Sequence, residues 1–472
     1  MTEAPRPESI RDNPRAPWLA VGVVCFGAFM GQLDASIVTL TFRPMERGFG
    51  APLAAVQWVS LAYLLVLVAL VTPAGRLADG VGRKLIYIYG FVVFTLGSAA
   101  CGLAPSLAVL ILCRLLQATG AAMLQANSVA LVTTSVPRSQ MRLALSIQAA
   151  AQSVGLGLGP TLGGLLTQTV GWRAVYWINV PVGIIAVVAG RYLLPRTMQL
   201  SRSASFDWPG AALLAAATTA LLVALSVISG LPAPGWLAAL LAVIAVAATV
   251  AFVGRQRSAR IPLIPRELLG SVRLALALAG AFLGYLVLFG PLVLVPQLLD
   301  GHGNEVRTGL ILSALPVGFG VAALTAESLF PAAVPNRVRG CIGAAVSAAA
   351  LVMLIFMAGS TAGIALLLGL TGLGLGMFVP ANNAVIMRSG AANSAAVLGG
   401  LVNMARGIGT TFGIAVVTLA LHLAGTEDRH LTFAVLAVAA ACAAVIAMTI
   451  RPLGTNGPSA VAAPGEHSSA FS

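Results

Sequence analysis

Two charged side chains stand alone inside long apolar stretches of the sequence. Asp34 lies in the apolar run 18–42, and Arg114 lies in a later one. An ionised carboxylate at the centre of such a lipid-length segment costs about 2.5 to 3.5 kcal/mol, so Asp34 must be hydrated, paired or protonated. A carboxyl group poised among these states can bind and release a proton, and we expect this chemistry of Asp34. The alternative is a structural carboxyl bonded to polar neighbours such as Gln32 or Ser36.

Arginine poses the opposite problem, because its guanidinium does not lose its proton. Arg114 therefore needs a carboxylate, backbone carbonyls or water within reach, and a purely structural bracket between two helices would also satisfy it. Arg406 lies in another apolar run, with no obvious acidic partner in the second half of the chain. Cavity lining and bonding between helices remain equally open for Arg406.

A glycine-rich loop joins the second and third apolar runs and reads Gly75-Arg-Leu-Ala-Asp79-Gly-Val-Gly82-Arg83-Lys84. Its glycines allow a tight turn, and we expect Asp79 to accept backbone N–H bonds where the next helix begins. Arg83 follows one helical turn later. The plainer interpretation is a basic loop that only sets the orientation of the chain in a membrane.

Glycines recur at every fourth position later in the chain, at Gly155, Gly159 and Gly163, with Gly164 adjacent. On a helix this spacing places them on one face, where a second helix can approach closely. Pro160 removes a backbone hydrogen bond and favours a bend. No strand or P-loop lysine accompanies these glycines, which argues against a nucleotide site. Close helix packing without any further role is the alternative.

Uncharged polar and aromatic side chains are scattered through the apolar runs. A mostly apolar cavity with such groups can hold amphipathic molecules without demanding one geometry. For any single residue, packing or bonding between helices is as open as ligand contact. The candidates for a cavity wall are Gln32, Trp58, Tyr63, Gln125, Asn127, Gln148, Gln152, Asn382, Asn383, Asn403 and Arg406.

The composition indicates that lipid surrounds the elements carrying these residues. Of 472 residues, 58% are hydrophobic and 9% are charged, against roughly 25% charged in a soluble domain. The net charge of +13 comes from arginines scattered through short loops, so we do not expect a nucleic-acid partner. The five cysteines form no CxxC pair and have no neighbouring histidine, so we expect no metal site.

Segments of about 20 apolar residues predict fourteen membrane-spanning helices. Basic residues number twenty in the loops on the side of both tails and five on the opposite side, which places both termini in the cytoplasm. The first span follows a polar tail and lacks a cleavage site, so we expect it to be retained. The predicted spans are 18–42, 54–74, 85–104, 107–134, 142–168, 174–194, 208–228, 235–254, 272–297, 307–330, 338–358, 361–386, 395–421 and 431–450.

A weak internal repeat pairs the first six spans with the last six. Asn127 recurs as Asn382, and the pair Gly155 and Gly157 recurs as Gly407 and Gly409, at offsets near 254. Two six-helix halves that face each other would enclose a central cavity. We predict a tail at 1–17, a half at 18–194, a linker with an inserted two-helix hairpin at 195–271, a half at 272–451 and a disordered tail at 452–472.

These motifs together resemble the major facilitator superfamily, and within it the fourteen-span drug:proton antiporters. The 75–84 loop is similar to the family's signature loop. Ala118, Thr39 and the degenerate second-half loop 331–340 depart from the pattern. The other blocks that carry the likeness are Leu33-Asp34-Ala-Ser-Ile-Val38, Gln57-Trp58 with Tyr63-Leu64, Arg114-Leu-Leu-Gln117-Ala-Thr-Gly120, the stretch from Gly155 to Gly164, Trp172-Arg173 and Ile178-Asn179-Val-Pro181.

The resemblance implies an exporter of lipophilic or amphipathic small molecules in exchange for protons, functional as a monomer in the inner membrane of a bacterium. It implies a proton-coupling role for Asp34 and Arg114, and a cytoplasmic gate at Gly75, Asp79, Gly82, Arg83 and Lys84. No cofactor is expected, because the proton gradient supplies the energy. The alternatives are an exporter of one metabolite or self-made antibiotic, a proton-coupled importer and a transporter-like membrane sensor. Four unclustered histidines argue against an enzyme.

Overall fold

The computed structural model describes residues 7, 13–137, 140–197, 207–260, 262, 270–299, 305–329, 334–356, 360–389, 395–424 and 429–450. Every regular element in these ranges is a helix. The first half holds α2 (Ala16–Ile37), η1 (Val38–Thr41), α3 (Phe42–Phe49), α4 (Leu53–Val56), α5 (Trp58–Val81), α6 (Arg83–Leu103), α7 (Leu107–Ser135), α8 (Met141–Thr169), α9 (Ala174–Trp177) and α10 (Asn179–Leu193).

The remaining helices follow in chain order after α10. A pair of long helices comes first and a second set of six completes the chain. They are α11 (Trp208–Ile228), α12 (Gly235–Ser258), α14 (Val272–Leu298), α15 (Glu305–Leu329), α16 (Asn336–Phe356), α17 (Thr361–Met387), α18 (Ala395–Ala424) and α19 (Arg429–Thr449). Residues 425–428, between the last two predicted spans, and the predicted tail at 452–472 lie outside the described residues.

Thirteen helices in the described ranges are long and apolar enough to cross a membrane. The predicted span that is missing from these thirteen is 142–168, which corresponds to α8. This helix has 29 residues, or about 43 Å of length. The predicted class, an all-α membrane protein, is confirmed, and the count is thirteen by this measure. Most predicted spans begin and end within a few residues of the observed helices.

The first span differs most from its predicted form. It was expected to continue to residue 42, but α2 ends at Ile37 and passes through the short 3-10 turn η1 into α3. The Oγ1 atoms of Thr39 and Thr41 donate to the carbonyls of Ser36 and Val38, at 2.7 and 2.6 Å. Such bonds to the carbonyl three residues earlier favour a tightened turn over a continuous α-helix.

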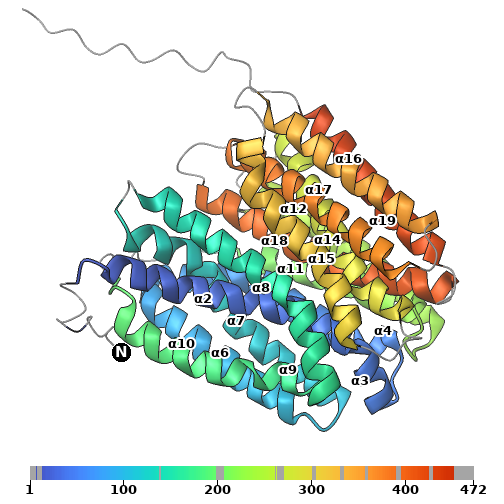
Figure 1. Ribbon diagram of the computed structural model, residues 1–472, viewed down its shortest axis with the longest axis horizontal. Helices are drawn as coiled ribbons and strands as arrows, with labels where there is room; N and C mark the ends of the chain where they lie inside the picture. The colour runs from blue at the N-terminus through green and yellow to red at the C-terminus, as the bar shows by residue number, and fades with distance from the viewer. Residues whose placement is uncertain are drawn as a thin grey trace, which may run out of the picture.

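The two six-helix halves lie side by side (Figure 1). In the first half α2 packs along α8 and α6 packs along α7. In the second half α14 packs in the same way along α18, and α16 along α17. Between the halves, α8 packs along α15 and α5 packs along α18. The same pattern of neighbours is therefore repeated in the two halves, and α5, α8, α15 and α18 make the largest contacts across the seam between them.

Glycine contacts give the repeat a sharper register than the sequence does. A Cβ at Gly155 in α8 would meet the carbonyl oxygen of Phe29 in α2, and a Cβ at Gly409 in α18 would meet that of Phe282 in α14. Gly155 therefore corresponds to Gly409, 254 residues later, and not to Gly407 as the sequence match proposed. Each half has two glycines separated by one residue, and the sequence alone does not tell which one faces the neighbouring helix.

The inserted hairpin, α11 with α12, packs on the seam between α5 and α18 mainly through α11. Asp207 caps α11 by accepting from the N–H of Gly210 at 3.0 Å, and it accepts from Nε of Arg255 at the end of α12 at 2.6 Å. The outer surface of α12 carries large exposed apolar side chains, including Val243 and Val250. A patch of this kind is stable facing lipid and would drive association in water.

Candidate functional site

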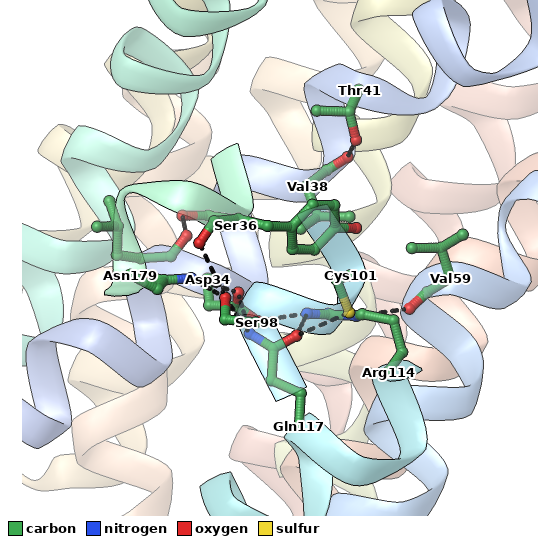
Figure 2. A network of polar contacts seen from close by, with 12 residues as sticks. Asp34, Ser36, Val38, Thr41, Val59, Ser98, Cys101, Arg114, Gln117 and Asn179 are labelled. Carbon is green, nitrogen blue, oxygen red and sulfur yellow. Dashed lines mark hydrogen bonds and ion pairs between the residues drawn. The ribbon is translucent and has the colours of Figure 1, made fainter. Parts of the chain in front are cut away.

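The structure joins Asp34 and Arg114 in a buried ion pair between α2 and α7. Arg114 NH1 lies 2.7 Å from Asp34 Oδ2, and the two side chains are 1% and 0% exposed. They are 80 residues apart in sequence, and the packing of α2 against α7 brings them together. Figure 2 shows the pair at the centre of a larger polar network. Because neither group reaches solvent, each depends on the other and on neighbouring dipoles for its solvation.

The second carboxylate oxygen of Asp34 is held by two amides. Oδ1 accepts from Gln117 Nε2 at 2.9 Å and from Asn179 Nδ2 at 3.1 Å. The same two amide nitrogens donate to Ser98 Oγ, each at 3.1 Å. Ser98 in turn donates to the carbonyl of Tyr176 at 3.0 Å. Three helices of the first half, α6, α7 and α10, thus supply Ser98, Gln117 and Asn179 to the network around the Asp34 carboxylate of α2.

Arg114 is satisfied on its other sides by one carbonyl, one amide and the rings of Tyr63 and Tyr176. Its Nε donates to the carbonyl of Val59 at 3.0 Å, and NH1 also donates to Gln117 Oε1 at 2.6 Å. Gln117 lies three residues after Arg114 and therefore shares its face of α7. The guanidinium stacks over the ring of Tyr63 at 4.0 Å. Arg114 consequently makes both contacts that the sequence had left as alternatives, a carboxylate and a bracket to the α5 backbone.

The alternative partners expected for Asp34 are not the ones it has. Ser36 donates to the carbonyls of Gln32 and Leu33, at 3.1 and 3.2 Å. Sequence reasoning gave no role to Ser98, Gln117 or Asn179. The last two stood in the blocks that resembled the family, and this was the only signal for them.

A central cavity of about 160 Å³ lies beside this network, between the halves. Tyr63 connects the two, because its ring stacks on Arg114 and also lines the cavity. Leu64, Leu124 and Phe289 supply apolar wall. The volume is below the roughly 300 to 1,000 Å³ of drug-sized sites, so a ligand of that size requires the halves to separate further. The predicted cavity residues that line it are Gln32, Tyr63, Gln125, Gln152, Asn403 and Arg406.

Four other predicted cavity residues are absent from its wall. Trp58 donates its Nε1 to Ser226 of the hairpin at 3.0 Å. Asn127 bonds the carbonyl of Met123 in its own helix, and Asn382 bonds the carbonyl of Ala277 at 2.7 Å. Gln148 is buried. Trp58, Asn127 and Asn382 therefore bond between or within helices, which is the alternative that the sequence analysis held open.

Asn383, the remaining candidate, also lies outside the cavity wall. Its Oδ1 is buried without a hydrogen-bond partner in the part of the chain that the structure describes.

The glycine face of α8 packs on the stretch of α2 that carries Asp34. A Cβ at Gly159 would collide with Ser36, and a Cβ at Gly163 would lie 2.9 Å from the carbonyl oxygen of Ile37. Gly164 is buried as well. On the other side of α8 the carbonyl of Pro160 lies against Gly309 of α15. This helix therefore links the helix of the carboxylate to the opposite half.

The loop motif is arranged differently from the expectation. Asp79 lies in the last turns of α5, which continues to Val81, and the N-cap residue of α6, Gly82, has no side chain to cap it. Asp79 Oδ1 instead accepts from Nε and NH2 of Arg83, at 3.0 and 2.9 Å. The N–H of Arg83 donates to Thr197 Oγ1 at 2.9 Å. Asp79 thus ties α5 to α6 through a side chain.

The tight turn of the motif is confined to one residue. Gly82 has φ +127°, a backbone conformation that L side chains rarely adopt. Gly75 lies within the helix α5, near the side chain of Ala126 in α7. Lys84 is buried at 2% exposure in the first turn of α6.

The sequence and the fold are similar to those of known transport proteins. Residues 24–414 match the family described as the Major Facilitator Superfamily. The multidrug resistance protein Stp of Mycobacterium tuberculosis is 34% identical over 427 residues, which cover 87% of this chain and 77% of that protein. The tetracenomycin C resistance and export protein of Streptomyces glaucescens is 33% identical over 414 residues, with coverages of 85% and 75%.

Two further matches extend over nearly all of both chains. The methylenomycin A resistance protein of Bacillus subtilis is 30% identical over 448 residues, which cover 92% of this chain and 94% of that protein. A crystal structure of a peptide transporter with bound sulfate superposes with a TM-score of 0.69, covering 95% of this chain and 96% of that one. At 15% identity the solved structure supports the fold alone.

Proposed function

The chain belongs to the major facilitator superfamily and is a membrane transporter, and we propose that it exports amphipathic small molecules in exchange for protons. The observation that carries the proposal is the buried pair of Asp34 and Arg114 beside the central cavity. Export rather than import is supported by the relatives, whose names describe drug resistance and antibiotic export.

The pair supplies a physical basis for coupling. Protonation of Asp34 removes the anion that Arg114 faces at 2.7 Å, and the guanidinium must then find other partners. Tyr63 stacks on that guanidinium and lines the cavity, so a shift of Arg114 reaches the ligand site. A ligand that favours one position of Arg114 thereby favours one protonation state of Asp34. Such a differential preference is what coupled exchange requires.

The contacts between the halves support a conformation closed at one end. Arg43 NH2 donates to the carbonyl of Gln297 at 3.2 Å, and Thr161 and Ser313 hydroxyls lie 2.6 Å apart. These residues lie toward the end of the bundle opposite the start of α2 and the end of α19. The cavity wall extends the other way, to Val129 in the last third of α7. With both termini in the cytoplasm, this state faces inward.

The orientation is open to a direct test in the bacterial cytoplasmic membrane. In a chain with its five cysteines replaced, a cysteine at Thr169 should react with an impermeant maleimide in intact cells, and one at Ser258 only after lysis. Both positions are exposed and lie at opposite ends of the bundle. The reverse pattern would invert the topology.

Proteoliposomes test the coupling. A substrate identified by resistance in expressing cells should accumulate against its gradient when a pH gradient is imposed, and a protonophore should abolish the accumulation. Equal accumulation with and without the protonophore would overturn proton coupling.

A dedicated exporter of one antibiotic is the second candidate, favoured by relatives named for tetracenomycin C and methylenomycin A. A panel of chemically distinct antibiotics separates the two functions. Resistance to several unrelated compounds supports a broad exporter, and resistance to one supports a dedicated exporter.

A further inference from the structure

Arg406 brings an unpaired positive charge to the cavity wall. It lies in α18, is half-buried and lines the cavity. Its guanidinium stacks over the ring of Tyr285 at 4.8 Å. Among the side chains that the structure describes, no carboxylate lies within ion-pair distance of it. A ring face stabilises a cation without neutralising it, so the full charge remains available to a ligand.

The rest of the cavity does not offset this charge. Arg406 is the only charged side chain that lines the cavity in the part of the chain described. Asp34 lies behind the wall, fully buried, and its charge is balanced by Arg114 at 2.7 Å. Protonation of Asp34 would remove that negative charge and make the region more positive. The cavity is therefore positive in both protonation states.

Hydrogen-bond donors lie next to Arg406 on the same helix face. Asn403 lies one turn before it and Thr410 one turn after it, and both line the cavity. Asn403 Oδ1 accepts from Gln125 Nε2 at 3.3 Å, which leaves the Asn403 amide nitrogen to donate. A cation with adjacent amide and hydroxyl donors matches an acidic oxygen pair.

The remaining wall favours rings and other apolar groups. Phe94, Phe289, Tyr63 and Tyr285 line the same space as Arg406, together with leucines of α5 and α7. Aromatic walls bury flat apolar surface well. A cationic ligand gains from these walls but is repelled by Arg406.

Resting on the proposed function of this cavity as the substrate site, we propose that it selects ring-containing apolar molecules that carry one acidic group, whose anion pairs with Arg406. Neutral analogues bind more weakly, and cationic analogues bind weakest. This charge preference narrows the substrate class beyond that of a general exporter of amphipathic compounds.

Three ligands that share one aromatic ring system and differ in charge isolate the contribution of charge to binding. Anthracene-2-carboxylate, anthracene-2-carboxamide and anthracen-2-ylmethylammonium are titrated onto the full chain in lipid nanodiscs, with empty nanodiscs subtracted. Wild type should bind the carboxylate about tenfold tighter than the amide, the scale of one charge-assisted bond. The ammonium should bind more weakly than the amide.

Variants then test whether Arg406 causes the preference for the carboxylate. In Arg406→Gln the affinities for the carboxylate and the amide should become nearly equal. Arg406→Lys should retain most of the preference for the carboxylate. Arg173→Gln is the matched control, because Arg173 also stacks on a ring, that of Trp172 at 4.3 Å, but does not line the cavity. It should leave this preference unchanged.

Three results would overturn the inference. They are a wild-type preference for the amide or the ammonium, an undiminished carboxylate preference in Arg406→Gln, and no specific binding of any of the three ligands. Binding in nanodiscs needs no gradient, so an Arg406-dependent preference without proton-driven transport would uphold this inference and reject the proposed function.

Discussion

The two halves share their packing and differ in their polar core. Gly120 of α7 approaches the backbone of Phe94 in α6, and Gly374 of α17 approaches that of Ser347 in α16 in the same way. These pairs and the Gly155 and Gly409 pair fix the register of the repeat at 253 to 254 residues. The close helix approaches that build each half are thus repeated.

At this register the polar network of the first half has an almost wholly apolar counterpart. The positions of Asp34, Ser98, Arg114 and Gln117 correspond to those of Val287, Leu351, Leu368 and Thr371, all fully buried. Burying the first set requires every charge and lone pair to be matched, whereas the second set carries only one hydroxyl. We conclude that the common scaffold does not require the network, which makes a functional role for it the stronger explanation.

The largest expected effect comes from substituting the carboxylate itself. Asp34→Asn keeps the shape and most hydrogen bonds but cannot cycle a proton, so uphill export in everted membrane vesicles should be abolished. Val287→Ala, at the corresponding position, should lower the thermal midpoint through lost packing and leave uphill export intact. If Val287→Ala lost uphill export and Asp34→Asn retained it, the functional role would belong to the second half and not to the polar network of the first.

A somewhat smaller loss is expected at the cation. Arg114→Lys keeps the charge but loses the planar fork that reaches Asp34, Val59 and Gln117 together. Hydrogen bonds to charged groups contribute about 1.5 to 3 kcal/mol each, so uphill export should fall by about tenfold or more. Leu368→Met, at the corresponding position, is the control. Wild-type export in Arg114→Lys would indicate that Arg114 only brackets helices.

Disturbing the close approach of α8 to α2 should lower transport less than substituting Asp34 or Arg114, but by a measurable amount. Gly159→Ala places a Cβ on Ser36 and the backbone of Ile37, which overpacks the interface at a cost of about 1 to 3 kcal/mol. The thermal midpoint and the transport rate should both fall. Gly157→Ala is the control, because its nearest neighbour, a Val317 methyl group, lies at 3.9 Å. Equal midpoints for the two variants would contradict this packing account.

The smallest effect is expected at the loop. Asp79 and Arg83 are 39% and 33% exposed, so their ion pair contributes only about 0.2 to 1 kcal/mol. Asp79→Asn should therefore change the ratio of the two facing states by no more than a few fold. Labelling of a cysteine at Val129, which lines the cavity, measures that ratio. A change of a hundredfold or more would mean that Asp79 has partners beyond Arg83 in the other state.

The sequence predicted the helices well because lipid imposes a simple rule. A run of about 20 apolar residues must form a helix to satisfy its own backbone, so most span limits follow from composition. The same rule identified Asp34 and Arg114, because each breaks an apolar run. Where side chains bond the backbone, as at Thr39 and Thr41, local chemistry shortened the predicted helix.

Side-chain direction could not be predicted in the same way. Trp58, Asn127, Gln148 and Asn382 are polar or aromatic residues in spans, as the true cavity residues are, but they do not line the cavity. Trp58 and Asn382 bond to neighbouring helices, and Asn127 bonds within its own. Hydropathy does not distinguish a face toward a cavity from a face toward another helix. Asn179 was missed for a related reason, since its partner Asp34 lies 145 residues away.

The central claim is that Asp34 couples proton movement to substrate movement, and the most direct test runs the exchange in reverse. In proteoliposomes at uniform starting pH, a substrate gradient is imposed and internal pH is followed with a trapped dye, with protein-free liposomes subtracted. Wild type should move protons against the direction of substrate flow, because coupling is reciprocal. Asp34→Asn should pass substrate downhill with no pH change. A wild-type pH change in Asp34→Asn, or substrate flow without proton movement in the wild type, would contradict the claim.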